Sequence, residues 1–247
     1  MKTADISVEY IQHTGSDLMV ANAARVSFDK ESTWLYDSGF PEMYIESLHN
    51  GAGYTIDDPG VTKTLSEKDA KLIRYLANHK HFSPFNHSFI TVKVRAPIFV
   101  SRQLVKHEYM PINEISRRYV DDEPTFYFPS EWRKRAENKK QGSSDEVFVG
   151  DIAEALSLKS EECARVCLDT YNFFLEKGVC PEQARMHLPL NMNTEWYWSG
   201  TLKAFAKMLS LRLDPHTQKE STDVAKEIRQ IIEPLFPVSV PALLAIN

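Results

Sequence analysis

The residues best suited to chemistry in this sequence lie between residues 102 and 118. Arg102 and Lys106, and likewise Gln103 and His107, are four residues apart, which places all of them on one side of a helix. A polar run follows, with an amide, a carboxylate, a hydroxyl and two guanidinium groups: Asn113, Glu114, Ser116, Arg117 and Arg118. Such a set of cations and hydrogen-bond donors is suited to an anion that carries a polar ring.

The same pattern is also compatible with a solvated helix face and a charged loop. Two features favour a binding site. The helix face lacks the pairs of opposite charge expected of a face that is merely soluble. The loop adds a carboxylate and a hydroxyl to its guanidinium groups. We therefore interpret residues 102–118 as a candidate anion-binding site and keep the solvated surface as the alternative.

A strand and a helix are expected to position these residues. Side chains between residues 89 and 94 alternate with the period of two that is typical of a strand. Pro97 ends the strand and is suited to the first turn of a helix. The apolar side of that helix is predicted to contain four residues, Ile98, Val100, Leu104 and Val105. We expect Pro111 to close it.

Residues 103–119 resemble the signature of the flavin-dependent thymidylate synthases. In that family, Arg-His-Arg is followed by seven residues and then by Ser, within an Asn-Glu-x-Ser-x-Arg-Tyr run. This chain has Lys106-His107-Glu108, seven residues and then Ser116, within an intact Asn-Glu-Ile-Ser-Arg-Arg-Tyr run. The spacing is the same, but Lys106 and Glu108 replace two arginines.

Other segments are similar to motifs of the same family and follow its order. They are Ala-Arg-Val-Ser at residues 24–27, His-Phe-Ser-Pro-Phe-Asn-His at 81–87, Ala-Arg-Met-His-Leu-Pro-Leu-Asn at 184–191, and Arg-Leu-Asp-Pro-His-Thr-Gln at 212–218. Together they span most of the chain. We interpret the chain as a member of this family or a close relative.

The resemblance implies an α+β fold of one domain, residues 1–247, with a central, mostly antiparallel sheet flanked by long helices. This is the homotetrameric thymidylate synthase-complementing-protein-like fold, with ligands held between subunits. It also implies a methyltransferase that binds FAD and moves a one-carbon unit from 5,10-methylenetetrahydrofolate to C5 of dUMP. Flavin hydride would reduce that unit to the methyl group of dTMP, and NADPH would reduce the flavin again. A nucleotide-binding relative that has lost catalysis is the alternative.

The same resemblance assigns candidate site residues. Seven match positions that contact dUMP: Gln103, Glu114, Ser116, Arg117, Arg118, Arg185 and Arg212. Ten match positions near FAD: Ser27, His81, Ser83, Lys106, His107, Glu108, Glu114, Thr201, Lys203 and Lys207. We expect Arg212 to be catalytic, because a fixed guanidinium beside the ring would stabilise negative charge that develops on uracil. Ser116 has no histidine base beside it in the sequence, so we expect it to orient dUMP rather than to act as a nucleophile.

Glu108 cannot take over an arginine's contact with a phosphate, because two like charges about 4 Å apart repel by roughly 1 kcal/mol in water and more in a partly buried site. We expect Glu108 to pair with a lysine, or to accept a hydrogen bond from a ribose or a ring N–H. Lys203 and Lys207 would then carry more of the contact with the phosphate.

Three histidines, His79, His81 and His87, leave a zinc hydrolase as a further alternative. No neighbouring carboxylate completes a ligand set, and Pro84 interrupts the regular geometry that would direct the rings together. We expect no metal.

Composition limits the classes of protein further. A chain of 247 residues with 43% hydrophobic content can bury a substantial core in one domain. Its net charge of −5 argues against a general nucleic-acid binder. No run approaches the roughly 20 apolar residues that span a bilayer. Three cysteines, an odd number, and no N-terminal apolar stretch predict a reduced, cytoplasmic protein.

The remaining segments are read from their breakers and periodicity. Residues 29–64 are expected to be a loop or insertion with a short helix at 42–49, and residues 133–148 a mobile surface loop, with residues 133–135 facing solvent. Helices are expected after a cap at Ser66 and at 151–177, 201–211 and 222–235. Cys163 and Cys167 are expected to fill the core, as is the aromatic run at 195–199.

Overall fold

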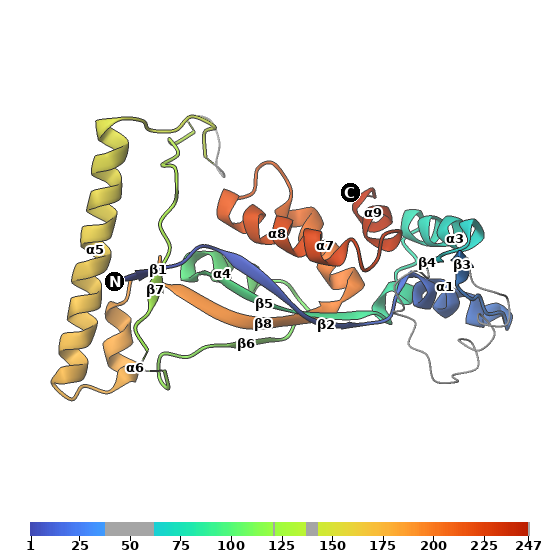
Figure 1. Cartoon of the computed structure of the whole chain (residues 1–247), viewed down its shortest axis with the longest axis horizontal. Helices are drawn as coiled ribbons and strands as arrows, with labels where there is room; N and C mark the ends of the chain where they lie inside the picture. The colour runs from blue at the N-terminus through green and yellow to red at the C-terminus, as the bar shows by residue number, and fades with distance from the viewer. Residues whose placement is uncertain (38–61, 121, 137–142, 247) are drawn as a thin grey trace.

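The computed structural model describes residues 1–37, 62–120, 122–136 and 143–246 (Figure 1). A four-stranded antiparallel sheet lies at its centre, in the order β2–β5–β8–β6. The strands are β2 (Ser7–Thr14), β5 (Phe89–Pro97), β8 (Asn193–Thr201) and β6 (Ile112–Glu114). Two short pairs accompany the sheet: β1 (Lys2–Thr3) runs parallel to β7 (Thr125–Phe126), and β3 (Leu35–Asp37) runs antiparallel to β4 (Thr62–Thr64).

Strand β5 is the middle of the sheet, and its alternation decides which face is buried. It pairs with β8 along its whole length, from Phe89 opposite Thr201 to Pro97 opposite Asn193. The inward residues of both strands meet in the core, where Val92 faces Trp198 and all of their surface is buried. The strand predicted from the sequence is confirmed, and so is the core position of Trp196 and Trp198, whereas Tyr197 of the same run is exposed because it lies on the other face of β8.

Three helices cover one face of this sheet: α4 (Ile98–Leu104), α7 (Leu202–Arg212) and α8 (Lys219–Ile232). Figure 1 shows α7 and α8 side by side above the strands. Helix α7 follows β8 directly, and the side chain of Thr201 caps it by accepting from the Ala204 N–H. The opposite face of the sheet carries charged residues, among them Lys93 and Arg95, which both pair with Glu195.

A group of short helices forms one end of the molecule: α1 (Asp17–Arg25), η1 (Val26–Phe28), α3 (Glu67–Asn78), η2 (Ser83–Asn86) and α9 (Ser239–Leu244). Ser66 caps α3 as predicted, accepting from the Asp69 N–H at 3.2 Å. Asp17 joins α1 to α9, because its buried carboxylate accepts from the N–H groups of Val238 and Ser239 at 2.8 and 3.0 Å.

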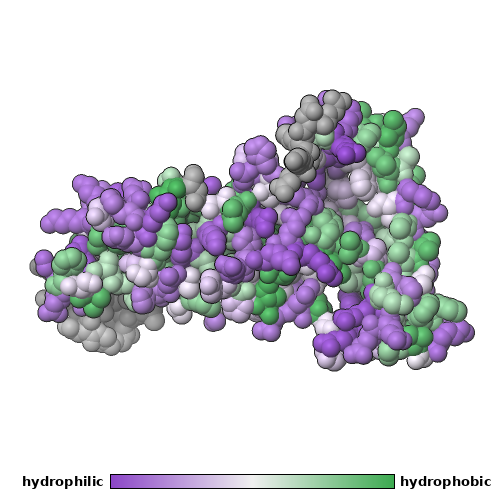
Figure 2. All heavy atoms as spheres, turned by 180° about the vertical axis from the view of Figure 1, so that it is seen from behind, coloured by the Kyte–Doolittle hydropathy of each residue, from purple (hydrophilic) through white to green (hydrophobic). Residues whose placement is uncertain are grey.

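The opposite end consists of α5 (Asp151–Glu176), α6 (Pro181–Ala184) and η3 (Arg185–His187). Helix α5 buries Ala164, Leu168 and Tyr171 in a second core cluster. Four large apolar side chains of α5 are more than half exposed: Ile152, Leu158, Val166 and Phe173. Figure 2 shows apolar patches recurring along this end. Cys163 is exposed and Cys167 is only half-buried, so the prediction that they fill the core is wrong: the side of α5 that packs on the cluster is the one with Ala164, Leu168 and Tyr171.

Several predicted boundaries also change. The helix after Pro97 ends at Leu104 rather than at Pro111, and Val105 is 40% exposed instead of buried. Glu114 lies in a strand, because β6 pairs with the edge of β8. Segment 133–148 is held at its ends by a bridge between Arg133 and Val147. Most of the segment predicted as an insertion, with its short helix, lies outside the described residues.

The α+β class and the central antiparallel sheet are confirmed. Among the described residues, no helix combines the length and apolar character that crossing a membrane requires.

Candidate active site

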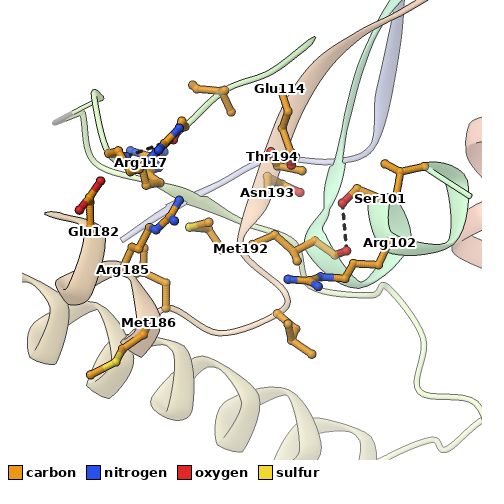
Figure 3. A pocket seen from close by; sticks show the side chains of 17 residues that line it. Ser101, Arg102, Glu114, Arg117, Glu182, Arg185, Met186, Met192, Asn193 and Thr194 are labelled. Carbon is orange, nitrogen blue, oxygen red and sulfur yellow. Dashed lines mark hydrogen bonds between the residues drawn. The ribbon is translucent and has the colours of Figure 1, made fainter. Parts of the chain in front are cut away.

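A cavity of about 860 Å³ lies between α4, the segment after β6, and the short turns α6 and η3. Five of the seven residues predicted to bind dUMP line it: Glu114, Ser116, Arg117, Arg118 and Arg185. Figure 3 shows the guanidinium groups of Arg102 and Arg185 extending into this space from opposite sides. The chain therefore brings together Arg102 and Arg185, which are 83 positions apart.

Hydrogen bonds hold several of these side chains. Glu114 accepts from the hydroxyl of Thr194, a buried residue of β8, at 2.6 Å. Ser116 accepts from Nε of Arg118 at 3.2 Å. Arg117 donates to the carbonyl of Asp122. Most of the guanidinium donors thus remain directed toward the cavity or solvent, as an anion site requires.

Thr194 was not identified from the sequence. Its role as a partner of Glu114 depends on the pairing of β6 with β8, which places the two side chains next to each other. Arg102 was recognised on the polar helix face but has no counterpart in the family's motifs as read from the sequence. Its lining of the cavity follows from the helical spacing that identified that face.

A second cavity of about 640 Å³ lies on another side of α4 and contains the other two residues predicted to bind dUMP, Gln103 and Arg212. Arg212 donates through Nε to Nε2 of His107 at 3.0 Å and through Nη2 to the carbonyl of Gln103 at 3.1 Å. Burial, together with the charges of Arg212 and Lys207, lowers the pKa of His107 to about 4. His107 is therefore neutral at pH 7 and can accept the hydrogen bond that orients Arg212.

Four of the ten residues predicted to bind flavin lie in the first two turns of α7 or pair with them, and we call them the α7 group: Glu108, Thr201, Lys203 and Lys207. Lys207 lies 3.7 Å from Glu108, so the lysine partner predicted for Glu108 is found. Nζ of Lys203 lies 3.5 Å from the ring centroid of Phe82, and burial and the charges of Lys207 and Lys80 lower the pKa of Lys203. Thr201 caps α7 and donates to Asn86 at 3.0 Å. An excess of positive charge therefore faces solvent here.

The other flavin candidates are placed around this group. His81 and Ser83 are exposed, at and beside η2, which contacts α7. Lys106 is exposed just after α4, and Ser27 is exposed in η1. Within one chain, the predicted site residues thus divide into the first cavity, the second cavity and the α7 group.

The three histidines of the zinc alternative do not form a ligand set. The His79 ring lies against the Tyr75 ring, with centroids 4.0 Å apart, and its Nδ1 lies 2.9 Å from the Tyr75 carbonyl. Across the part of the chain that the structure describes, no three His, Cys, Asp or Glu side chains converge on a metal position.

With this geometry in view, comparisons with known proteins identify the family. The family model described as thymidylate synthase complementing protein matches residues 9–238. The chain belongs to this family. The matched residues include both cavities and the α7 group, so the whole candidate site lies within the family's shared region.

Members of the family with similar sequences are named flavin-dependent thymidylate synthases. That of Thermus thermophilus is 42% identical over 178 residues, which are 72% of this chain, and the aligned region spans 64% of the length of the Thermus protein. That of Kosmotoga olearia is 39% identical over 184 residues, covering 73% of this chain and 78% of the relative.

A solved structure shares the fold over nearly the full length. It is the UMP/dUMP methylase PolB from Streptomyces cacaoi bound with 5-Br dUMP, which has a TM-score of 0.76 and 29% sequence identity. The match covers 99% of this chain and 97% of PolB.

Proposed function

We propose that the chain is a flavin-dependent thymidylate synthase, which converts dUMP to dTMP with 5,10-methylenetetrahydrofolate as the carbon donor, FAD as the cofactor and NADPH as the reductant of the flavin. The observation that carries the proposal is the first cavity, where Glu114, Ser116, Arg117, Arg118 and Arg185 come together. Three guanidinium groups with a carboxylate and a hydroxyl form a site for a nucleoside monophosphate.

In this proposal the arginines of the first cavity bind the phosphate of dUMP. A guanidinium offers planar, paired donors that match phosphate oxygens. Ser116, which already accepts from Arg118, donates its own proton to a phosphate oxygen. Glu114 keeps one carboxylate oxygen on Thr194 and has the other available for a sugar hydroxyl or a ring N–H.

Arg212 has the catalytic role. Its Nε and Nη2 atoms are held by His107 and by the carbonyl of Gln103, so the guanidinium has a fixed direction before substrate binds. Its remaining N–H groups face the second cavity, which Arg212 lines. Donors fixed in advance stabilise charge that develops on a uracil oxygen as C5 becomes nucleophilic, without the cost of reorganisation.

The α7 group has the chemistry that the pyrophosphate of FAD requires. Lys203 forms no ion pair with any carboxylate among the described residues, and burial makes its charge costly without an anion. Lys207 adds positive charge nearby, and Glu108 partly neutralises it. Lys106, just after α4, is a further cation that the proposal assigns to the cofactor. When bound, the flavin supplies the hydride that reduces the transferred carbon to a methyl group.

We further propose that the whole chain, residues 1–247, acts as one domain in a homotetramer whose sites form between copies. Two observations support this arrangement. Residues with one predicted ligand, dUMP, line two cavities on different sides of α4. The exposed apolar side chains of α5 also offer a surface that a second copy would bury. The three free cysteines are consistent with the reducing cytoplasm as the place of action.

The first experiment is a visible absorbance spectrum of the protein after incubation with FAD and desalting, repeated with dUMP. We expect a retained flavin band that shifts when dUMP is added, followed by dTMP formation in a complete assay. UMP is tested in parallel, because PolB is named as a methylase of both nucleotides. A protein that binds dUMP but retains no flavin would favour the non-catalytic nucleotide binder, which the substitutions at Lys106 and Glu108 would then explain.

A further inference from the structure

Glu220 is a buried carboxylate in the first turn of α8 that the proposed reaction does not use. Only 4% of its surface is exposed. Both of its oxygens accept from Nη2 of Arg133, at 2.7 and 2.9 Å, and one also accepts from Nε2 of Gln218 at 2.9 Å. Burial alone would raise the pKa of Glu220, but the hydrogen bonds from Arg133 and Gln218 and the charge of Arg133 outweigh it and lower the pKa. The carboxylate is therefore ionised at pH 7.

An ionised carboxylate only accepts hydrogen bonds, so it determines the direction of the bonds beyond it. Gln218 must turn its NH₂ group toward Glu220 and its oxygen away. That oxygen accepts from Nε2 of Gln103, and Oε1 of Gln103 accepts from the hydroxyl of Ser221 at 3.1 Å. One negative charge thus orders three consecutive donor–acceptor pairs that end on Gln103.

Gln103 is the residue through which this order reaches the site. It lines the second cavity beside Arg212, and its backbone carbonyl accepts from Arg212. With Oε1 held by Ser221 and one N–H of Nε2 held by Gln218, the second N–H of Nε2 has no partner among the described residues. This N–H is available to an acceptor in the cavity, such as an oxygen of a nucleotide.

We propose that Glu220 is a positioning residue of the nucleotide site: it fixes the side-chain amide of Gln103 so that Gln103 presents an N–H donor, rather than its oxygen, to the ligand. The inference rests on the proposed function, because the ligand is taken to be dUMP. Arg133 has the supporting role of keeping Glu220 ionised, from a segment that the sequence predicted to face solvent.

The Glu220→Gln variant removes the negative charge that fixes the direction of the hydrogen bonds of Gln218 and Gln103. A glutamine at this position can turn its NH₂ group toward Gln218, and the amides of Gln218 and Gln103 can then both reverse with every hydrogen bond still made. Part of the population would present the Gln103 oxygen to an oxygen of dUMP. We expect the dissociation constant of dUMP to rise on the order of tenfold, the effect of losing one net hydrogen bond to an anionic ligand.

A purely structural role for Glu220 makes a different prediction, and a double-mutant cycle separates the two. The Gln103→Leu variant has no amide to orient. If Glu220 acts through Gln103, adding Glu220→Gln to Gln103→Leu will weaken dUMP binding no further. If Glu220 only holds segment 133–148 on α8, the two effects will multiply.

The measurement is calorimetric titration with dUMP of the wild type, both single variants and the double variant, with melting temperatures recorded for each. Arg133→Met/Glu220→Gln is a second route to the same perturbation that leaves no buried cation unpaired, and we expect it to weaken dUMP binding similarly. Glu233→Gln, which breaks the exposed pair with Arg229 just after the same helix, is the matched control and should leave binding unchanged.

Each outcome has a definite meaning. Unchanged dUMP affinity in both Glu220 variants, or multiplying effects in the cycle, would overturn the positioning role while leaving the proposed function in place. A wild-type chain that binds no dUMP would overturn the proposed function, and this inference with it. A rise in the dissociation constant for Glu220→Gln that disappears in the Gln103→Leu background would establish the role.

Discussion

Replacing Glu108 by glutamine should strengthen the binding of FAD. Nζ of Lys207 lies 3.7 Å from the Glu108 carboxylate, in the group of cations around the start of α7. In the proposed flavin site, this carboxylate competes with the flavin pyrophosphate for Lys207 and also repels it. The amide of Glu108→Gln keeps the shape of the side chain and removes the negative charge, so Lys207 becomes fully available to the phosphate.

The size of the effect follows from the exposure of the pair. Two unit charges 3.7 Å apart interact by about 1 kcal/mol in water and by about 4 kcal/mol at the effective dielectric constant of a partly buried site. The Lys207 and Glu108 side chains are 61% and 70% exposed, so the smaller value applies. We expect about a fivefold lower dissociation constant for FAD at low salt, and a much smaller difference at 0.5 M salt, where exposed charges are screened.

Quenching of FAD fluorescence during titration with protein measures this change directly. Glu146→Gln is the matched control, because Glu146 forms a comparably exposed ion pair with Lys134 away from α7. Lys207→Met should weaken FAD binding in the same assay. Unchanged or weaker binding of FAD by Glu108→Gln would refute the electrostatic reasoning and would mean that the carboxylate itself accepts a hydrogen bond from the cofactor.

Three further predictions concern other parts of the molecule. Asp17→Ala leaves the buried N–H groups of Val238 and Ser239 without an acceptor and should cost about 3 kcal/mol of the free energy of unfolding, measured with urea. The pKa of His107 is about 4 in the folded chain and near 6.5 in the unfolded chain. Its contribution to the free energy of unfolding is therefore constant above pH 6.5 and is lost as the pH falls toward 4. In His107→Gln, the free energy of unfolding should fall by roughly 2 kcal/mol less between pH 7 and pH 4 than in the wild type, a value reduced for the partial exposure of the ring. The same pH profile of unfolding in both proteins would contradict this. Arg185→Met should weaken dUMP binding at least tenfold without changing the melting temperature, because this arginine is exposed; calorimetry and a thermal melt together test it.

Those parts of the fold that depend on local pattern were predictable from the sequence. The alternation around Val92 identified β5, Pro97 marked the change from strand to helix, and Ser66 marked the start of α3. Each depends on neighbours within a few positions. The same is true of the cluster around Ser116, which led to the predicted nucleotide site and of which Glu114, Ser116, Arg117 and Arg118 line one cavity.

The features that were missed depend on partners far away in the chain. Pro111 was expected to end a helix, but the segment after it pairs with β8, about 85 residues later, and becomes strand β6. Arg133 was expected to face solvent, yet its partner Glu220 lies 87 positions away. The division of the predicted dUMP residues between two cavities beside α4 was not predicted either. It depends on which residues of distant segments pack on each side of this short helix.

The long separation between Gln103 and its partners also has a consequence for biosynthesis. The side-chain hydrogen bonds of Gln103 cannot form until the ribosome has made Gln218 and Ser221, 115 and 118 residues later. A growing chain can pair β2 with β5 before these residues are made, whereas contacts of such separation close slowly and late. During synthesis, the second cavity should therefore take its final form only after the ribosome has added the first turn of α8.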